Sequence, residues 1–481
     1  MTGSVVHSDV LVVGAGSAGA IVAERLSTDP ACMVTVLEAG FGLADPALAM
    51  QTANGRRLPI GPASRLVRRY EAALIGRVGQ LTTIVRGATI GGSGAVNGGY
   101  FCRGLPADFN AWPAGWSWPD VLESFRSIET DLDFRGDQHG DSGPIPVQRT
   151  HEMCDGTKYF IDAVQRCGFG WISDLNDATM TSLPGVGAVP LNIVDGVRAG
   201  PGAAYLVPAL QRPNLTVLTE TSALRVEIGR DRARAVHAIG PSGPVRLTAD
   251  RIVLCAGAIE SAHLLMLSGV GPEAMLRQAG IGVLAELPVG RHCADHPEWL
   301  VAADWPGTPD RPVLEAVLCD GDLEIRPYSA GFATMVDGGG PAGPPEIGVA
   351  LMAPLARGRL TLVSGDPRVS PRIEHRYDTE PDDLAVLRRG VALVAEMLGL
   401  RADAAAPRWS TSQHLCGSAP MGSDADEVAV VDEQCRVRGI EGLWVIDGAV
   451  LPRIPSRGPH ATIAMLAHRA AEFVRAQERS R

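Results

Sequence analysis

The stretch Asp9-Val10-Leu11-Val12-Val13-Gly14-Ala15-Gly16-Ser17-Ala18-Gly19 decides the fold of this chain. Its apolar first half predicts a buried strand and its glycines predict a tight turn, after which residues 20–26 begin a helix. Residues 34–37 predict a second strand, which ends at Glu38. A Gly-x-Gly-x-x-Gly turn between a strand and a helix, followed by an acidic residue after the next strand, is typical of a dinucleotide-binding βαβ unit.

The glycine turn has a specific physical use. Gly14, Gly16 and Gly19 would let the backbone approach a pyrophosphate, with Ser17 and Ala18 completing the turn at the positive end of the helix. The carboxylate of Glu38 would accept hydrogen bonds from an adenosine ribose and would disfavour a 2′-phosphate, which argues against NADP. The alternative is a purely structural glycine turn.

Further strands are predicted far along the chain, at residues 215–218, 223–228, 251–254 and 443–446. Because 481 residues exceed the size at which a single core stops growing, about 250–300 residues, we expect two domains. The predicted fold class is α/β, an α+β two-domain arrangement with a discontinuous Rossmann-type nucleotide domain and a smaller domain of sheet plus helix. The nucleotide domain would comprise residues 1–145, 185–300 and 413–481, and the second domain residues 146–184 and 301–412.

Two local expectations belong to the second domain. Residues 348–354 and 359–364 flank a short glycine-containing turn, which predicts paired strands. Residues 382–400 show helical periodicity after Pro381.

Composition excludes several classes of protein. Forty-three basic against 54 acidic residues leave a formal charge of −11, so no general basic surface for nucleic acid is expected. The nine cysteines are odd in number and contain no Cys-x-x-Cys pair, which indicates neither a disulfide framework nor a zinc knuckle and favours a cytoplasmic setting. No apolar run is long enough for a transmembrane segment, although peripheral association with a membrane stays open.

A second glycine-rich stretch runs from Arg86 through Gly91, Gly92, Ser93 and Asn97 to Gly98 and Gly99. A dinucleotide site needs one such loop, so a second one suggests backbone amides along a longer cofactor. By itself this stretch is equally a loop packed against a sheet.

Two histidine-bearing segments, residues 414–422 and 458–462, lie near the C-terminus. Together with the features above, the chain resembles the GMC (glucose-methanol-choline) flavin oxidoreductases over nearly its full length. The matching segments, in chain order, are residues 14–19 with Glu38, 86–99, 257–271, 295–297, 414–422 and 447–460.

The resemblance implies FAD as cofactor, bound non-covalently because Val96 stands where some relatives carry a flavin-linked histidine. The implied cofactor-binding residues are Gly14, Gly16, Ser17, Ala18, Gly19, Glu38, Arg86, Gly91, Gly92, Ser93, Asn97, Gly98, Ala223, Asp447 and Gly448.

The same resemblance implies a catalytic pair, His414 and His460, which would remove a hydride from a CH–OH carbon to flavin N5. An imidazole near the hydroxyl is the expected base at neutral pH. His414 is favoured as that base and His460 as the residue that shares the hydroxyl's hydrogen bonds, but some relatives carry Asn at the second position, so a purely positioning role stays open. Residues 292–296 carry two histidines, a cysteine and an aspartate, yet no second ligand cluster accompanies them, and no metal is expected.

Residues 94–106, 131–146 and 414–420 resemble the mycofactocin-associated branch of the family. That branch implies mycofactocinol as the alcohol donor and a respiratory electron acceptor, in alcohol metabolism. The alternatives are an FAD alcohol dehydrogenase or oxidase acting on a small alcohol, and a non-catalytic flavoprotein that serves as an electron-transfer partner.

Overall fold

The computed structural model describes residues 6–77, 79–179, 184–340, 343–399 and 407–476. Its first large sheet gathers strands from both ends and from the middle of the chain, as predicted. The strands run in the order β11-β2-β1-β14-β13-β12, and β22 pairs with β14 beyond this path. Their bounds are β1 Val6–Val13, β2 Val34–Leu37, β11 Leu215–Leu218, β12 Ser222–Gly229, β13 Arg232–Gly240, β14 Gly243–Leu254 and β22 Leu443–Val445.

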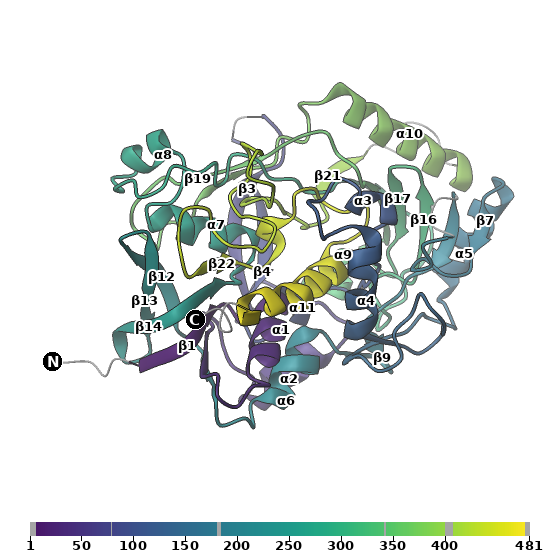
Figure 1. Cartoon of the computed structure of the whole chain (residues 1–481). Coiled ribbons are helices and arrows are strands. Elements are labelled where there is room, and N and C mark those ends of the chain that lie inside the picture. The colour runs from purple at the N-terminus through teal and green to yellow at the C-terminus, as the bar shows by residue number, and fades with distance from the viewer. Residues whose placement is uncertain (1–5, 78, 180–183, 341–342, 400–406, 477–481) are drawn as a thin grey trace.

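The strands β11, β2, β1, β14 and β22 are parallel to one another, and β13 and β12 add antiparallel strands at the edge beside β14. Helix α1 (Ser17–Leu26) follows β1, and helix α11 (His460–Ala476) packs beside α1 near the centre of Figure 1. The apolar residues of β1, α1 and α11 are almost fully buried in one core. The first and last segments of the chain are therefore inseparable parts of one nucleotide-binding unit.

A second sheet lies on the other side of the molecule, at the right of Figure 1, in the order β21-β15-β18-β17-β16-β8-β7. Helices α10 (Pro381–Leu398) and α5 (Asp155–Arg166) pack on it and bury Leu387, Val394 and Phe160. The helix expected after Pro381 is confirmed, while residue 400 lies outside the described residues. The strands are β7 Gly170–Ile172, β8 Gly185–Ala188, β15 Pro297–Ala302, β16 Ala316–Asp320, β17 Leu323–Pro327, β18 Glu346–Leu351 and β21 Arg408–Thr411.

This pairing corrects one expectation. Residues 348–354 and 359–364 do not pair, because β18 already uses both of its edges, with β15 on one side and β17 on the other. Strand β19 (Arg359–Thr361) joins a separate small sheet with β20 (Arg372–Glu374), β3 (Val67–Ala73) and β4 (Thr82–Gly87). Strands β8 and β15 both lie in the second sheet, so we place the domain boundaries near residues 188 and 297 in place of the predicted 184 and 300, which puts β8 in the second domain.

The remaining elements are short and connect the sheets. They are α2 Pro46–Ala53, η1 Gly92–Ala95, α3 Pro106–Phe109, α4 Trp118–Ile128, β5 Glu129–Asp131, β6 Ile145–Val147, β9 Ile193–Val194, β10 Val197–Arg198, η2 Gly202–Leu206, α6 Val207–Ala209, α7 Gly257–Leu267, α8 Glu273–Gln278, α9 Phe332–Met335 and η3 Gly448–Val450. Among the described helices, none combines the length and the apolar character that crossing a membrane requires.

Candidate active site

The two glycine-rich stretches interlock backbone against backbone. The amide of Gly91 donates to the carbonyl of Ala15 at 2.8 Å. Gly92 adopts a φ of +53°, and a Cβ on it would lie 2.7 Å from the Cα of Gly16. Only glycine fits at this contact, because any side chain would push the two loops apart. The two stretches thus form one backbone cradle, which is the candidate cofactor site.

The start of α1 is open to an anion. Its N-terminal amides follow Gly16 and receive no side-chain cap, so their donors stay available. Gly19 lies so close to the carbonyl of Gly14 that a Cβ would sit 1.9 Å from that oxygen. Ser17 and Ala18 occupy the first turn of the helix. Free backbone amides at a helix N-terminus, next to a turn without side chains, are what a pyrophosphate requires, so the cradle fits this group.

Glu38 lies at the end of β2 with its side chain buried. Its Oε2 accepts from the amide of Ala15 at 3.0 Å and its Oε1 from the amide of Gly40 at 2.8 Å. Burial raises the pKa of Glu38 to about 7, although both amide hydrogen bonds lower it. A carboxylate has about four acceptor sites, so lone pairs remain for ribose hydroxyls.

The second loop is tied down by Arg198, a residue that sequence motifs did not reveal. Its Nε donates to the carbonyl of Asn97 at 2.9 Å and its Nη1 to that of Ala95 at 3.1 Å. Ser93 Oγ accepts from the amide of Gly87. The Nη2 of Arg86 is buried and has no hydrogen-bond partner among the described residues, as expected of a donor reserved for a bound group.

The other predicted cofactor residues differ in what they offer. Gly98 lies against Val313, and Ala223 pairs with Ala238 next to a bulge in β12. The carboxylate of Asp447 is already used within the protein. It accepts from the amides of Ala449 and Gly257 and from the hydroxyl of Ser261, at 2.6–2.8 Å. The carbonyls of Asp447 and Gly448 also accept, from the amides of Val450 and Gly417, so the backbone amides are the groups left for a cofactor.

His460 begins α11 and is half-buried. Its Nε2 lies 3.1 Å from Ser17 Oγ, and its Nδ1 lies 3.2 Å from the amide nitrogen of Asn97. The side-chain oxygen of Asn97 accepts from the backbone amide of Gly99, so the side-chain nitrogen of Asn97 is the donor to Nδ1 of His460. The proton of the neutral His460 ring then sits on Nε2. Desolvation and Arg198 lower the pKa of His460 to about 4. Both of its nitrogens are engaged by residues of the cofactor cradle.

His414 is likewise half-buried and follows β21. Its Nδ1 lies 2.9 Å from Nδ1 of His296, and the two rings are perpendicular. Asp295 Oδ1 accepts from the backbone amides of both histidines, at 2.7 Å and 2.8 Å. Desolvation, His296 and Arg326 lower the pKa of His414 well below its ordinary value. A neutral imidazole is thus held beside the cradle.

The predicted catalytic pair is not joined by a hydrogen bond or a ring contact in the described structure. His460 acts on His414 through its charge, which lowers the pKa of His414 less than His296, Arg326 and Arg86 do. The direct partner of His414 is His296. The sequence contains a signal for this partner, because Asp295-His296-Pro297 is one of the segments that resemble the family, but that resemblance assigns no role to His296.

A buried ionic network around Arg326 lies close enough to His296 and His414 to affect the pKa of both rings. Arg326 Nη1 donates to Ser412 Oγ at 2.7 Å, and its Nε donates to Glu324 Oε2 at 3.0 Å. Tyr100 donates to Glu324 Oε1 at 2.7 Å. Charged residues alternating along a buried strand match no motif, so sequence reasoning missed them.

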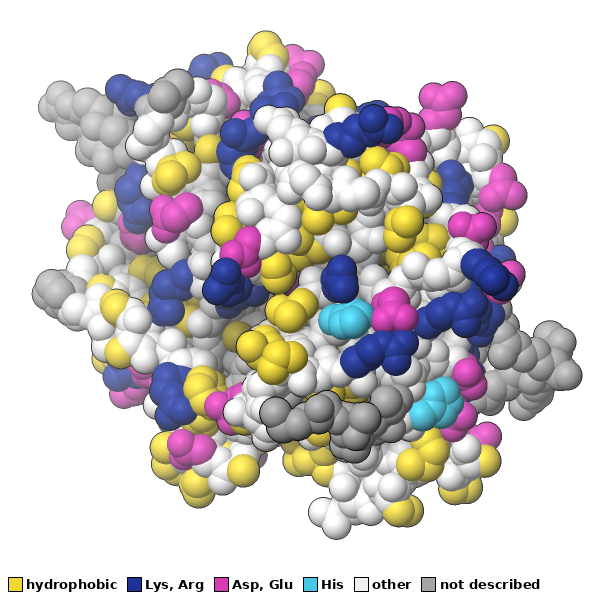
Figure 2. Space-filling view, turned by 90° about the vertical axis from the view of Figure 1, so that its left-hand side faces the viewer, with side chains coloured by type: hydrophobic (Ala, Val, Ile, Leu, Met, Phe, Trp, Pro, Cys, Tyr) yellow, Lys and Arg dark blue, Asp and Glu magenta, His cyan; other side chains and the backbone are white. Residues whose placement is uncertain are grey.

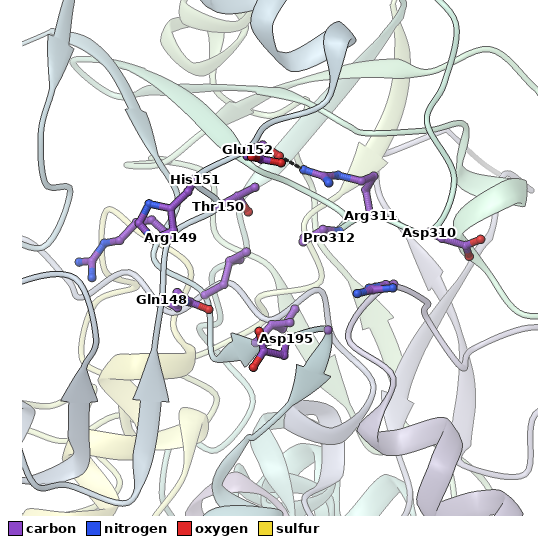
Figure 3. A pocket seen from close by; sticks show the side chains of 13 residues that line it. Gln148, Arg149, Thr150, His151, Glu152, Asp195, Asp310, Arg311 and Pro312 are labelled. Atoms are coloured by element: carbon purple, nitrogen blue, oxygen red, sulfur yellow. Dashed lines mark hydrogen bonds between the residues drawn. The ribbon is translucent and has the colours of Figure 1, made fainter.

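A surface groove of about 410 Å³ is not lined by His296, His414 or His460 (Figure 3). Its walls include Gln148, His151, Asp195 and Arg311, and none of the predicted site residues lines it.

The face in Figure 2 mixes basic, acidic and apolar side chains, so it offers no continuous basic surface for a nucleic-acid backbone.

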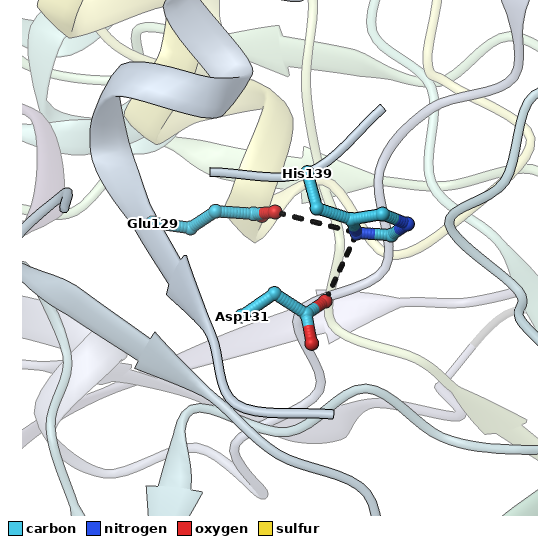
Figure 4. Close-up of side chains that lie close together, drawn as sticks. All are labelled: Glu129, Asp131 and His139. Atoms are coloured by element: carbon cyan, nitrogen blue, oxygen red, sulfur yellow. Dashed lines mark hydrogen bonds and ion pairs between the residues drawn. The ribbon is translucent and has the colours of Figure 1, made fainter. Parts of the chain in front are cut away.

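Glu129, Asp131 and His139 form a compact buried group with ligand atoms within 4.8 Å of one another (Figure 4). These carboxylates are already paired: Arg103 binds Glu129, and Arg149 Nη1 lies 2.5 Å from Asp131 Oδ2. The guanidinium groups of Arg103 and Arg149 neutralise the carboxylates that a metal ion would otherwise bind, so we interpret this group as a structural cluster of charges.

Comparison with known proteins agrees with this geometry. Two family models described as GMC oxidoreductase match residues 8–298 and 354–467. The chain is 40% identical to an uncharacterized GMC-type oxidoreductase of Rhodococcus erythropolis, covering 98% of this chain and 99% of that protein. It is 32% identical to pyridoxine 4-oxidase of Microbacterium luteolum, covering 95% and 98%.

Solved structures of other proteins share the fold of this chain. The crystal structure of pyridoxine 4-oxidase from Mesorbium loti superposes with a TM-score of 0.85 at 28% identity, covering 98% of this chain and 99% of that one. A formate oxidase structure has a TM-score of 0.85 at 22% identity over the full length of both chains, which shows the shared fold. The predicted α/β fold, the cofactor FAD and the enzyme class are confirmed. The chain belongs to the GMC oxidoreductase family, whose members are FAD-dependent enzymes acting on CH–OH donors.

Proposed function

We propose that this enzyme oxidises the CH–OH group of mycofactocinol, with His414 as the base, and passes the electrons to a respiratory acceptor. The α-hydroxy amide of the donor would become an α-keto amide. Bound FAD supplies the hydride acceptor at N5. The enzyme would work in the cytoplasm or at the inner face of the membrane, where such an acceptor is reached.

The observation that carries the CH–OH oxidation is the state of His414. Its Nδ1 is used by His296, whereas no described residue forms a hydrogen bond to its Nε2. The ring is half-buried and its pKa is lowered, so it is neutral at neutral pH. A neutral imidazole with one unengaged nitrogen can accept the hydroxyl proton as the hydride leaves.

His460 supports the cofactor side of the reaction. Through Ser17 and Asn97 it links the two glycine loops and sets their spacing. Val96 is buried and offers no nucleophile, which supports non-covalent binding of FAD. Arg86, with an unused donor, would hold a polar group of the cofactor.

The choice of mycofactocinol rests on the resemblance of residues 94–106, 131–146 and 414–420 to the mycofactocin-associated branch. A second candidate is direct oxidation of a small alcohol. It is favoured by the pyridoxine 4-oxidases, which match this chain over almost its whole length. Both candidates use the same base.

The test is anaerobic stopped-flow reduction of the FAD-loaded enzyme, followed by the flavin absorbance. Mycofactocinol, pyridoxine and a panel of simple alcohols are mixed in separately. Rapid bleaching by mycofactocinol alone supports the proposal, and bleaching by a simple alcohol alone replaces it with the second candidate. If His414→Ala reduces the flavin as fast as the wild type, the site is not catalytic in this way, and a non-catalytic electron-transfer role gains support.

A further inference from the structure

We propose that His296 is a positioning residue that holds His414 in the one tautomer able to act as a base, with the proton on Nδ1 and the lone pair on Nε2. The inference deepens the proposed function and rests on His414 being the base. It assigns to the Asp295-His296 segment a role in proton transfer.

The geometry allows only two arrangements. The Nδ1 atoms of the two rings are 2.9 Å apart, so one carries a proton and donates while the other accepts. If His296 donates, the proton of neutral His414 sits on Nε2 and the ring cannot accept a substrate proton. If His414 donates, its Nε2 carries a lone pair.

The proposed role of His414 selects between them. No described residue forms a hydrogen bond to Nε2 of His414, so this is the nitrogen available to take the hydroxyl proton, and as a base it must carry the lone pair. His414 then donates from Nδ1, and Nδ1 of His296 accepts. The neutral ring of His296 keeps its own proton on Nε2, which is buried and forms no hydrogen bond with a described residue.

Desolvation, together with the nearby arginines, keeps both rings neutral. Around His296, Arg326 from β17 disfavours an imidazolium, whereas Asp295 and Glu324 favour it, and desolvation dominates. Around His414, Arg326 from β17, Arg86 from β4 and His460 from α11 all disfavour an imidazolium. Desolvation and Arg326 lower the pKa of His296 to about 4.

Asp295 also fixes the relative position of His296 and His414. Asp295 Oδ1 accepts from the backbone amides of His296 and His414, while its Oδ2 accepts from Tyr377 at 3.0 Å and Thr411 at 2.8 Å. One carboxylate therefore sets the distance between two segments that are 118 positions apart. The ring of His414 has a defined direction before any donor arrives, which is the condition for efficient general-base catalysis.

A first test reads the tautomer directly and needs no donor. Protein labelled with ¹⁵N in histidine is studied by NMR with FAD bound, and the signals of His414 and His296 are assigned from His414→Gln and His296→Asn. We expect the neutral His414 ring to be protonated at Nδ1 and not at Nε2. Protonation at Nε2 with a bare Nδ1 overturns the inference.

A second test uses two substitutions. His296→Asn keeps a hydrogen-bond acceptor near the position of Nδ1, whereas His296→Leu removes it. We expect His296→Leu to lower the rate of flavin reduction by about 10²-fold, in the range of general-base contributions, and to shift the pH profile. His296→Asn should recover most of that rate and the wild-type profile.

Wild-type rates and pH profile in His296→Leu overturn the inference, and so does an equal loss in both variants with unchanged flavin spectra. If His296→Leu fails to fold, the NMR experiment and His296→Asn still decide. Failure of the proposed function looks different, because His414→Ala would then keep the wild-type rate, whatever the tautomer of His414.

Discussion

Ser17 Oγ and His460 Nε2 lie 3.1 Å apart although 443 positions separate them in the chain. Ser17 opens α1 and His460 opens α11, and these two helices pack against each other along the nucleotide-binding sheet. The contact brings the two helix N-termini together at the glycine cradle. An anionic cofactor there would meet the positive ends of both helices.

His460→Ala should weaken FAD binding more than it slows chemistry. It removes the hydrogen bonds to Ser17 and Asn97, each worth about 1 kcal/mol, so we expect the Kd for FAD to rise by about 5- to 30-fold. Titration of apoprotein followed by flavin fluorescence measures it. His468→Ala, on the same helix but paired with Arg25, is the control and should leave the Kd unchanged. An unaltered Kd with a flavin reduction rate lowered by about 10²-fold would instead make His460 a catalytic partner of His414.

His414→Asn should lower the rate of flavin reduction by about 10²- to 10⁴-fold with little change in FAD binding, because it removes the proton acceptor. Stopped-flow rates and FAD titration on the same preparation separate the two effects. His468→Asn is the control, because His468 also has a lowered pKa but pairs with Arg25 away from His414, and it should retain most of the rate.

The rate of flavin reduction should depend on pH with a definite sign. The base must be neutral, and desolvation lowers the pKa of His414, so the active form persists below the ordinary histidine value of about 6.5. We expect a plateau through neutral pH and a fall only at lower pH. A midpoint at or above about 6.5 would contradict the lowered pKa.

FAD affinity should rise with pH around neutrality. The pKa of Glu38 is about 7 without ligand because burial disfavours the carboxylate, and ribose hydroxyls would favour the ionised form and lower that pKa. Binding is then coupled to loss of a proton, so it weakens as pH falls below 7. Measuring the Kd between pH 5.5 and 8.5 tests this, and Glu38→Gln should remove this part of the pH dependence while weakening binding throughout.

Arg149→Met should lower the free energy of unfolding by about 3–5 kcal/mol, because it leaves buried carboxylates without their partner. Arg149 pairs with Asp131 at 2.5 Å and with Asp174 at 2.7 Å, and all three side chains are buried. Urea unfolding monitored by circular dichroism measures the loss. Arg368→Met removes an exposed pair with Asp366 and should change stability by less than about 0.5 kcal/mol. Equal effects of the two substitutions would rule out a structural role for the cluster.

Much of the fold could be predicted because its signals are local. Residues 9–19 carry a strand, a turn and a helix start within one short window, and Glu38 follows the next strand at the expected place. The strands at 215–218, 251–254 and 443–446 were also predicted, and all lie in the nucleotide-binding sheet. The pairing of 348–354 with 359–364 was wrong because strand partners are chosen by the whole sheet, and β18 found both of its partners elsewhere.

The sequence by itself determined the fold class and the cofactor FAD, and it singled out the glycine-rich stretches, His414 and His460 as the candidate site, because glycine spacing and short motifs carry that information. Only the tertiary structure decided which groups those histidines meet. It placed His460 against Ser17 and Asn97, gave His414 the partner His296, and added Arg198 and Arg326 from strands without motifs. The physical reason is that the proton positions and pKa of a buried imidazole are set by neighbours a few ångströms away in space, and those neighbours come from segments more than one hundred residues apart.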